Sequence, residues 1–157
     1  MADLTHLDEH GAAHMVDVGG KAVTRRVATA SGRITMSDEA LDAIRQGNTS
    51  KGDVLGTARI AGIMAAKQTA NLIPLCHPLP LDQISIDLAI EAGAINATAS
   101  ISVAGRTGVE MEALTGVTVA LLTLYDMAKA LDKSMVIQDV RLLAKTGGST
   151  DKSQPAA

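Results

Sequence analysis

The stretch from Thr107 to Lys133 limits the folds open to this chain more than any other. Its apolar residues recur every three or four positions, which predicts one long helix with an apolar stripe. Its middle is apolar on almost every side, so other parts of the chain must cover it. Charges stand only near its ends, where Asp126 and Lys129 share a helical face. Such a pair is either a structural ion pair or an acid/base pair.

The composition sets limits on size, compartment and partners. The 157 residues fit one domain, and its core must be aliphatic, because the chain has one Tyr and no Phe or Trp. A net charge of −3 argues against nucleic acid as a partner, so an anionic ligand needs a local basic pocket. We expect no disulfide, because Cys76 is the single cysteine, and no signal peptide or membrane span. These features favour a cytoplasmic protein.

The remaining elements predict the fold class. In order, the sequence predicts a strand over 21–36, a helix from the N-cap Ser37 to Gly47, a helix over 54–72, a proline-rich loop over 73–80, hairpin strands over 84–90 and 95–103, the long helix, and a strand over 135–145. This order predicts an α+β, ferredoxin-like split βαβ fold, with an antiparallel sheet and the helices packed on one face. The other face would be bare, which favours subunit association. We expect a flexible segment over 1–14, a single ferredoxin-like domain over 15–146 and a disordered tail over 147–157.

Several chemically active side chains lie at the ends of these elements. His77 either presents its imidazole from a rigid loop or packs against backbone, and Cys76 beside it does not complete a metal site. Lys51 and Arg106 precede helices, where they either hold a phosphate or are ordinary turn residues. Two glutamates in the first turn of the long helix, Glu110 and Glu112, either stabilise the helix end or act in a site. Together these residues favour a site for an anionic small molecule.

Four longer strings carry a family resemblance: HMVDV (14–18) and the segments 51–79, 105–133 and 140–148. They resemble the molybdenum cofactor biosynthesis protein C family, the cyclic pyranopterin monophosphate synthases, from about Leu4 to Gly148. The resemblance implies a ferredoxin-like lyase of molybdopterin biosynthesis. Its members convert (8S)-3′,8-cyclo-7,8-dihydroguanosine 5′-triphosphate into the pterin product and release pyrophosphate. A radical-SAM enzyme upstream makes this substrate. The resemblance also implies a homohexamer, a trimer of dimers, with the active site at a dimer interface.

The resemblance also implies roles for individual residues. It assigns catalysis to Asp126, Lys129 and Lys51. It assigns substrate binding to Leu75, Cys76, His77, Glu110, Met111, Glu112 and Lys145, and phosphate binding to Arg25 or Arg26. Clustered lysines lower one another's pKa, so one is expected to act as a base while another stays charged. No cofactor or metal site is implied, although Mg²⁺ on the substrate phosphates is compatible with the reaction.

Two other classes of function remain open. One is a ferredoxin-like module that senses a nucleotide without turnover, which would not need an acid/base pair on the long helix. The other is a structural oligomer in which Asp126 and Lys129 form an interface ion pair. In that case, replacing either residue would break assembly and not chemistry.

Overall fold

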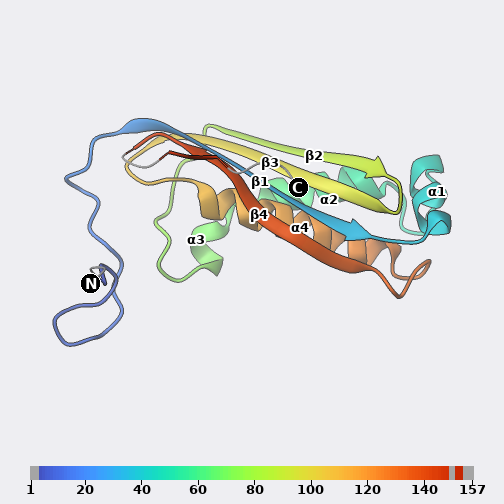
Figure 1. Cartoon of the computed structure of the whole chain (residues 1–157), viewed down its shortest axis with the longest axis horizontal. Helices are drawn as coiled ribbons and strands as arrows, with labels where there is room; N and C mark the ends of the chain where they lie inside the picture. Colours follow the sequence, from blue (N-terminus) through green and yellow to red (C-terminus); the bar gives the residue numbers. More distant parts are fainter. Residues whose placement is uncertain (1–3, 149–150, 154–157) are drawn as a thin grey trace.

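The computed structural model describes residues 4–148 and 151–153, and its main feature is one antiparallel sheet with helices on one face (Figure 1). The elements are β1 (Thr24–Thr35), α1 (Asp38–Gln46), α2 (Val54–Lys67), α3 (Thr69–Leu72), β2 (Gln83–Glu91), β3 (Ala94–Gly105), α4 (Glu110–Ala128), β4 (Val136–Thr146) and β5 (Lys152–Ser153). The strand order is β2-β3-β1-β4-β5. This arrangement confirms the predicted α+β, ferredoxin-like fold.

Strand β1 lies at the centre of the sheet, and its side chains alternate between the two faces. It pairs with β3 on one side and with β4 on the other. Ala28, Ala30 and Ile34 are buried toward the helices, whereas Thr29, Ser31 and Arg33 lie on the opposite face. At Gly32 a Cβ atom would lie 2.8 Å from Leu121 Cδ1, so glycine is what lets β1 approach α4 here.

Helix α4 forms the centre of the core, as its apolar sequence predicts. Val117, Leu121 and Leu124 are fully buried. The helix is long and apolar enough to cross a membrane by composition alone, but half of that window is buried in this fold. It runs from Glu110 to Ala128 and is therefore shorter than the predicted range 107–133. The chain turns away at its end, where the amide of residue 131 donates to the Ala128 carbonyl at 2.8 Å.

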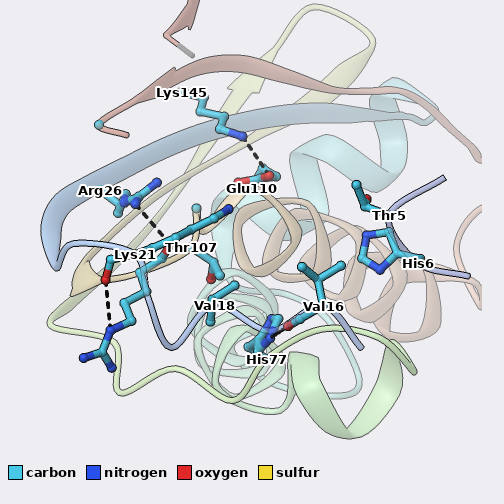
Figure 2. A pocket seen from close by; sticks show the side chains of 13 residues that line it. Thr5, His6, Val16, Val18, Lys21, Arg26, His77, Thr107, Glu110 and Lys145 are labelled. Carbon is cyan, nitrogen blue, oxygen red and sulfur yellow. Dashed lines mark hydrogen bonds and ion pairs between the residues drawn. The ribbon is translucent and has the colours of Figure 1, made fainter. Parts of the chain in front are cut away.

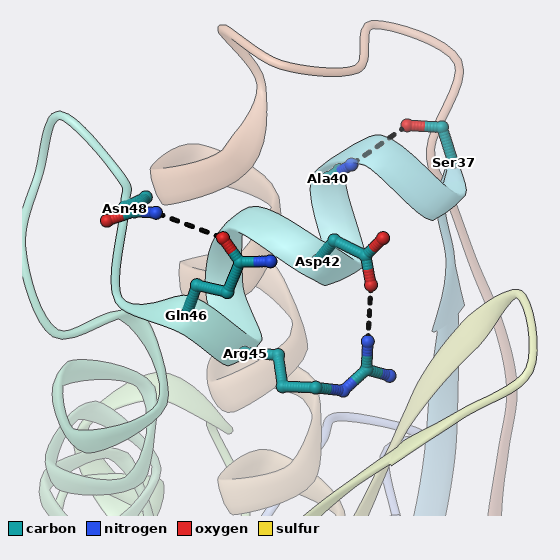
Figure 3. A network of polar contacts seen from close by, with 6 residues as sticks. All are labelled: Ser37, Ala40, Asp42, Arg45, Gln46 and Asn48. Atoms are coloured by element: carbon teal, nitrogen blue, oxygen red, sulfur yellow. Dashed lines mark hydrogen bonds and ion pairs between the residues drawn. The ribbon is translucent and has the colours of Figure 1, made fainter.

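Local side-chain contacts set the ends of the other helices. The Ser37 hydroxyl accepts a hydrogen bond from the Ala40 amide at 3.2 Å and begins α1, and Gly47 ends it in the left-handed region, which confirms both predicted caps (Figure 3). The predicted helix over 54–72 is divided into α2 and α3. The Thr69 hydroxyl donates to the carbonyl of Ala66 at 2.9 Å, which competes with the regular helical pattern.

The expected disorder over 147–157 stays a prediction. Within this segment, Lys152–Ser153 pair with β4 at Ala144 and Lys145. The turn between the strands begins at Gly147, whose amide donates to Asp151 Oδ1 at 3.0 Å. Residues 149–150 and 154–157 lie outside the described part. The flexibility of 1–14 and the remaining domain boundaries stay predictions.

Candidate active site

The expected site residues fall into two clusters at opposite ends of α4. The lysine cluster comprises Lys51, Asp126 and Lys129. The cavity cluster comprises Arg26, Cys76, His77, Glu110, Glu112 and Lys145. Glu110 and Asp126 are sixteen residues apart on one helix, which at 1.5 Å per residue separates their backbones by about 24 Å. Within one chain, the two clusters therefore do not meet.

In the lysine cluster, one carboxylate bridges two ammonium groups. Lys51 Nζ lies 2.8 Å from Asp126 Oδ2, and Lys129 Nζ lies 2.8 Å from Asp126 Oδ1. Lys51 reaches Asp126 from the turn before α2 and also donates to its backbone carbonyl at 3.1 Å. All three side chains are about half exposed. The cluster is therefore a solvent-accessible cationic site and not an ion pair buried in the core.

The charges in this cluster lower the pKa of Asp126 and raise the pKa of Lys129. Hydrogen bonds from Lys129 and then Lys51 lower the pKa of Asp126 to about 2. The Asp126 carboxylate in turn raises the pKa of Lys129 through its hydrogen bond and its charge. The expectation that clustered lysines lower one another's pKa is therefore wrong for Lys129, because a carboxylate lies between the two amines. Lys129 is held as an ammonium and is a poor candidate for the base.

At the other end of α4, a cavity of about 360 Å³ opens between the N-terminal segment and the sheet (Figure 2). Its lining residues are Thr5, His6, Val16, Val18, Lys21, Arg26, His77, Arg106, Thr107, Gly108, Glu110, Lys145 and Gly147. Lys145 Nζ donates to Glu110 Oε1 at 3.0 Å. Glu110 Oε2 is buried and has no hydrogen-bond partner among the described residues. A buried acceptor without a partner is unfavourable, so this oxygen requires a donor such as an ordered water or a ligand group.

A smaller cavity of about 130 Å³ adjoins the first and shares part of its wall. Its lining residues are Leu75, Cys76, His77, Leu79, Thr107, Gly108, Glu110, Met111 and Glu112. Glu112 is only 4% exposed, and burial, with a contribution from the Glu110 charge, raises the pKa of its carboxyl. Burial and then the charges of the two glutamates raise the pKa of the Cys76 thiol. Cys76 is therefore a packed thiol in this wall and not an activated nucleophile.

The two candidate phosphate-binding arginines face opposite sides of the sheet. Arg26 lines the large cavity, and its guanidinium donates to the carbonyls of Gly105 at 3.3 Å and Arg106 at 3.1 Å. Arg25 lines a different hollow, on the other face of β1, with Asp82 and Ser102. The structure thus brings Arg26 together with the other expected site residues and does not bring Arg25 there.

Sequence analysis missed the glycine pair that makes room for Arg26. A Cβ atom at Gly147 would collide with the backbone carbonyl of Arg25, and one at Gly148 would collide with the Arg26 guanidinium. Both glycines also have positive φ angles, of 90° and 79°. In the sequence, the two adjacent glycines at the end of the predicted strand could have indicated this close approach of the backbone to Arg25 and Arg26. Thr5, His6, Val16 and Val18 were also missed, because no local pattern joins residues 4–18 to a loop at 77.

The described residues contain no group of three or more His, Cys, Asp or Glu side chains placed to hold a metal ion. What the arrangement offers is a cation-rich cavity with an imidazole, a smaller aliphatic cavity with a buried carboxyl group, and a separate bridged pair of lysines. Such groups can bind a polyanion, donate hydrogen bonds to a leaving group and move protons.

A family model and several known proteins match nearly the whole chain, and they indicate the same family. The family model described as the MoaC family matches residues 15–148. A cyclic pyranopterin monophosphate synthase of Novosphingobium aromaticivorans is 66% identical over 96% of this chain and 96% of its own length. Proteins of the same name from Parvibaculum lavamentivorans and a Nostoc species are 58% and 56% identical, over 94% and 99% of this chain and 93% and 94% of their own lengths. The chain therefore belongs to the MoaC family.

Proposed function

We propose that this protein is a cyclic pyranopterin monophosphate synthase. It would convert (8S)-3′,8-cyclo-7,8-dihydroguanosine 5′-triphosphate into cyclic pyranopterin monophosphate and release pyrophosphate, as a lyase of molybdenum cofactor biosynthesis. The observation that carries the proposal is 66% identity to a protein of that name over 96% of both chains. The two charged clusters on α4 offer functional groups that suit this reaction.

The cavity cluster is suited to bind the substrate. Lys21, Arg26, Arg106 and Lys145 give the large cavity a cationic lining against the single carboxylate of Glu110. This surplus of positive charge favours a polyphosphate group. The adjoining small cavity places Leu75, Leu79 and Met111 beside the buried carboxyl of Glu112. These groups suit a heterocycle rich in N–H donors. His77 borders both cavities and is the candidate for proton transfer.

The lysine cluster is suited to stabilise the departing pyrophosphate. Lys129 and Lys51 present two ammonium groups that Asp126 holds at fixed positions. Ammonium groups held in place before the reaction stabilise negative charge as it develops on a leaving group. In this role Asp126 orients the two lysines, and Lys129 acts as a hydrogen-bond donor or acid. This assignment follows from the raised pKa of Lys129.

A reaction that uses both clusters requires two copies of the chain. A reacting atom must lie within about 3.2 Å of each group that acts on it, and the clusters are separated by about 24 Å along α4. A neighbouring copy that brings its lysine cluster to the cavity cluster of the first would complete the site. This requirement supports the homohexamer, a trimer of dimers with the active site at a dimer interface.

The proposal also covers the source of the substrate, the compartment, the partners and the cofactors of the enzyme. The substrate would come from a radical-SAM enzyme upstream, in the cytoplasm, without nucleic acid or membrane as a partner. No resident cofactor is proposed. Mg²⁺, if used, would bind through the substrate phosphates, since the described residues hold no carboxylate cluster for it.

A single-turnover assay tests the proposal. Wild type, Lys129→Ala and the control Lys133→Ala would be mixed with enzymatically made cyclic dihydroguanosine triphosphate, and pyrophosphate and pterin fluorescence would be followed. Lys133 is an exposed lysine just beyond the cluster, so its loss changes net charge equally. We expect product from wild type and Lys133→Ala but not from Lys129→Ala, all at the same oligomeric size. Substrate binding without product in any of the three would favour the nucleotide-sensing alternative.

A further inference from the structure

The N-terminal segment 4–21 contributes to the site but has few contacts of its own with the fold. All its described residues are exposed except Val16 and Val18, which are partly buried. These two alternate along an extended stretch, so their side chains point to the same side, and both line the large cavity. Thr5, His6 and Lys21 complete this wall (Figure 2).

Two hydrogen bonds attach this segment to the rest of the described chain. The Val16 carbonyl lies 2.7 Å from His77 Nε2, and the Lys21 carbonyl accepts a hydrogen bond from Arg106 Nε at 3.1 Å. The segment's other backbone hydrogen bonds are internal, such as that from the His14 amide to the His6 carbonyl at 3.0 Å. A segment attached at so few points is easily detached from the fold.

The contact with Val16 fixes the position of a proton on His77. A carbonyl oxygen only accepts hydrogen bonds, so Nε2 must carry the hydrogen. In the neutral ring, the other nitrogen, Nδ1, then has a free lone pair. Within the described residues Nδ1 has no hydrogen-bond partner, and the ring borders both cavities. The ring is therefore prepared to accept a hydrogen bond or a proton through Nδ1.

We propose that the Val16 carbonyl is a positioning group for His77, and that the N-terminal segment is a functional part of the site. By holding the Nε2–H tautomer, the segment makes Nδ1 the nitrogen that receives a proton from the substrate. The same segment closes one side of the cavity and brings the Lys21 ammonium group to it. The expected effect on turnover rests on the proposed function, whereas the expected tautomer does not.

The experiment uses the small number of histidines in the chain. His6, His10, His14 and His77 are the four. A full-length reference carrying His6→Asn, His10→Asn and His14→Asn has His77 alone, and so does a truncation that removes residues 1–18. A matched control removes residues 1–13 and carries His14→Asn, so it keeps Val16. Ring nitrogen chemical shifts would be recorded after histidine labelling, at a pH where the ring is neutral, beside kcat and KM.

We expect the reference and the shorter truncation to show a protonated Nε2 and an unprotonated Nδ1. Removal of residues 1–18 should give the averaged shifts of two exchanging tautomers. It should also lower kcat by at least ~10-fold, which is less than the ~100-fold or more expected for loss of the acid or base itself, with a smaller change in KM. A reference with hydrogen on Nδ1, or a longer truncation that keeps the single tautomer, would overturn the inference. If that truncation does not fold, the reference spectrum still decides.

The result also separates this inference from the proposed function. If the reference shows the expected tautomer but the unsubstituted protein shows no turnover, the synthase assignment is overturned and the role of Val16 stands. Normal turnover with the opposite tautomer would overturn the role of Val16 alone.

Discussion

Lys129 Nζ lies 2.8 Å from Asp126 Oδ1, on the solvent-exposed side of the end of α4. Since both side chains are more than half exposed, neither is needed to fill the core. We expect Lys129→Ala and Asp126→Ala each to lower kcat by at least ~100-fold, in the range for loss of a group that stabilises a transition state. Pyrophosphate release measures the effect, with Lys133→Ala as the charge-matched control. Near-normal turnover would remove the residue from the mechanism, and loss of assembly would favour the structural oligomer.

The same contact predicts how stability depends on acid. The pKa of Asp126 is lowered to about 2 in the folded chain, below its ordinary value of 3.8. A lowered carboxyl pKa stabilises the fold above the unfolded pKa, and this contribution is lost as pH falls through the folded value. We expect wild type to be slightly more stable than Asp126→Asn at pH 6, and equal to it near pH 2. Urea unfolding across this range measures the difference, and a constant difference would contradict the prediction.

Glu112 should show the opposite dependence on pH. Burial raises the pKa of its carboxyl, so the folded chain binds a proton more tightly than the unfolded chain does. Stability then falls as pH rises through the window between the ordinary value of 4.5 and the raised value. We expect Glu112→Gln to raise the Tm at pH 7, with no gain below pH 4, and to reduce turnover. Thermal unfolding at both pH values, beside the assay, checks this trade-off. A lower Tm at pH 7 would show that Glu112 is paired in the assembled protein.

Most of the fold could be predicted from the sequence, because its patterns are local. Alternating residues indicated β1 to β4, and the turn at Gly93 has the positive φ of 73° that such a hairpin favours. The ends of the helices were harder to predict from the sequence. The break between α2 and α3 falls at Gln68, and α4 ends at Ala128, but no Pro or Gly marks either point in the sequence.

The sequence allowed a set of candidate site residues to be proposed, but it did not give their arrangement in space. Lys145 and Glu110 are 35 positions apart, and only the packing of β4 beside α4 brings them to 3.0 Å. The choice between Arg25 and Arg26 required the face of β1 to be known. The contact between Val16 and His77 joins two loops 61 positions apart, which no spacing rule anticipates.

Gly62 should tolerate no side chain, because α2 and α4 approach each other there. A Cβ atom at this position would lie 2.9 Å from the backbone carbonyl of Gly116. We expect Gly62→Ala to lower the free energy of unfolding by about 1–3 kcal/mol, the usual cost of overpacking. Gly20→Ala is the matched control, since nothing lies within 4 Å of its Cβ position. Denaturant unfolding compares the two, and equal stability would show that the helices separate without cost.

A site shared between two chains, as we propose, predicts that two inactive variants restore activity when they are mixed. Lys145→Ala damages the cavity cluster and Lys129→Ala damages the lysine cluster. If each site takes one cluster from each chain, half of the randomly mixed dimers contain both variants, and one of their two sites is intact. The mixture, refolded or coexpressed at equal amounts, should therefore recover about a quarter of wild-type turnover. Turnover no greater than that of the separate variants would place the whole site within one chain.

The length of α4 determines how well the chain tolerates insertions and deletions. One helix carries Glu110 in its first turn and Asp126 in its last, so its length fixes the distance between the lysine cluster and the cavity cluster. A substitution in its middle alters packing, whereas one inserted residue would shift Asp126 by about 1.5 Å and rotate it by about 100° relative to Glu110. Insertions and deletions should therefore be far more damaging within α4 than in the loop over 130–135, which lies beyond Asp126 and Lys129.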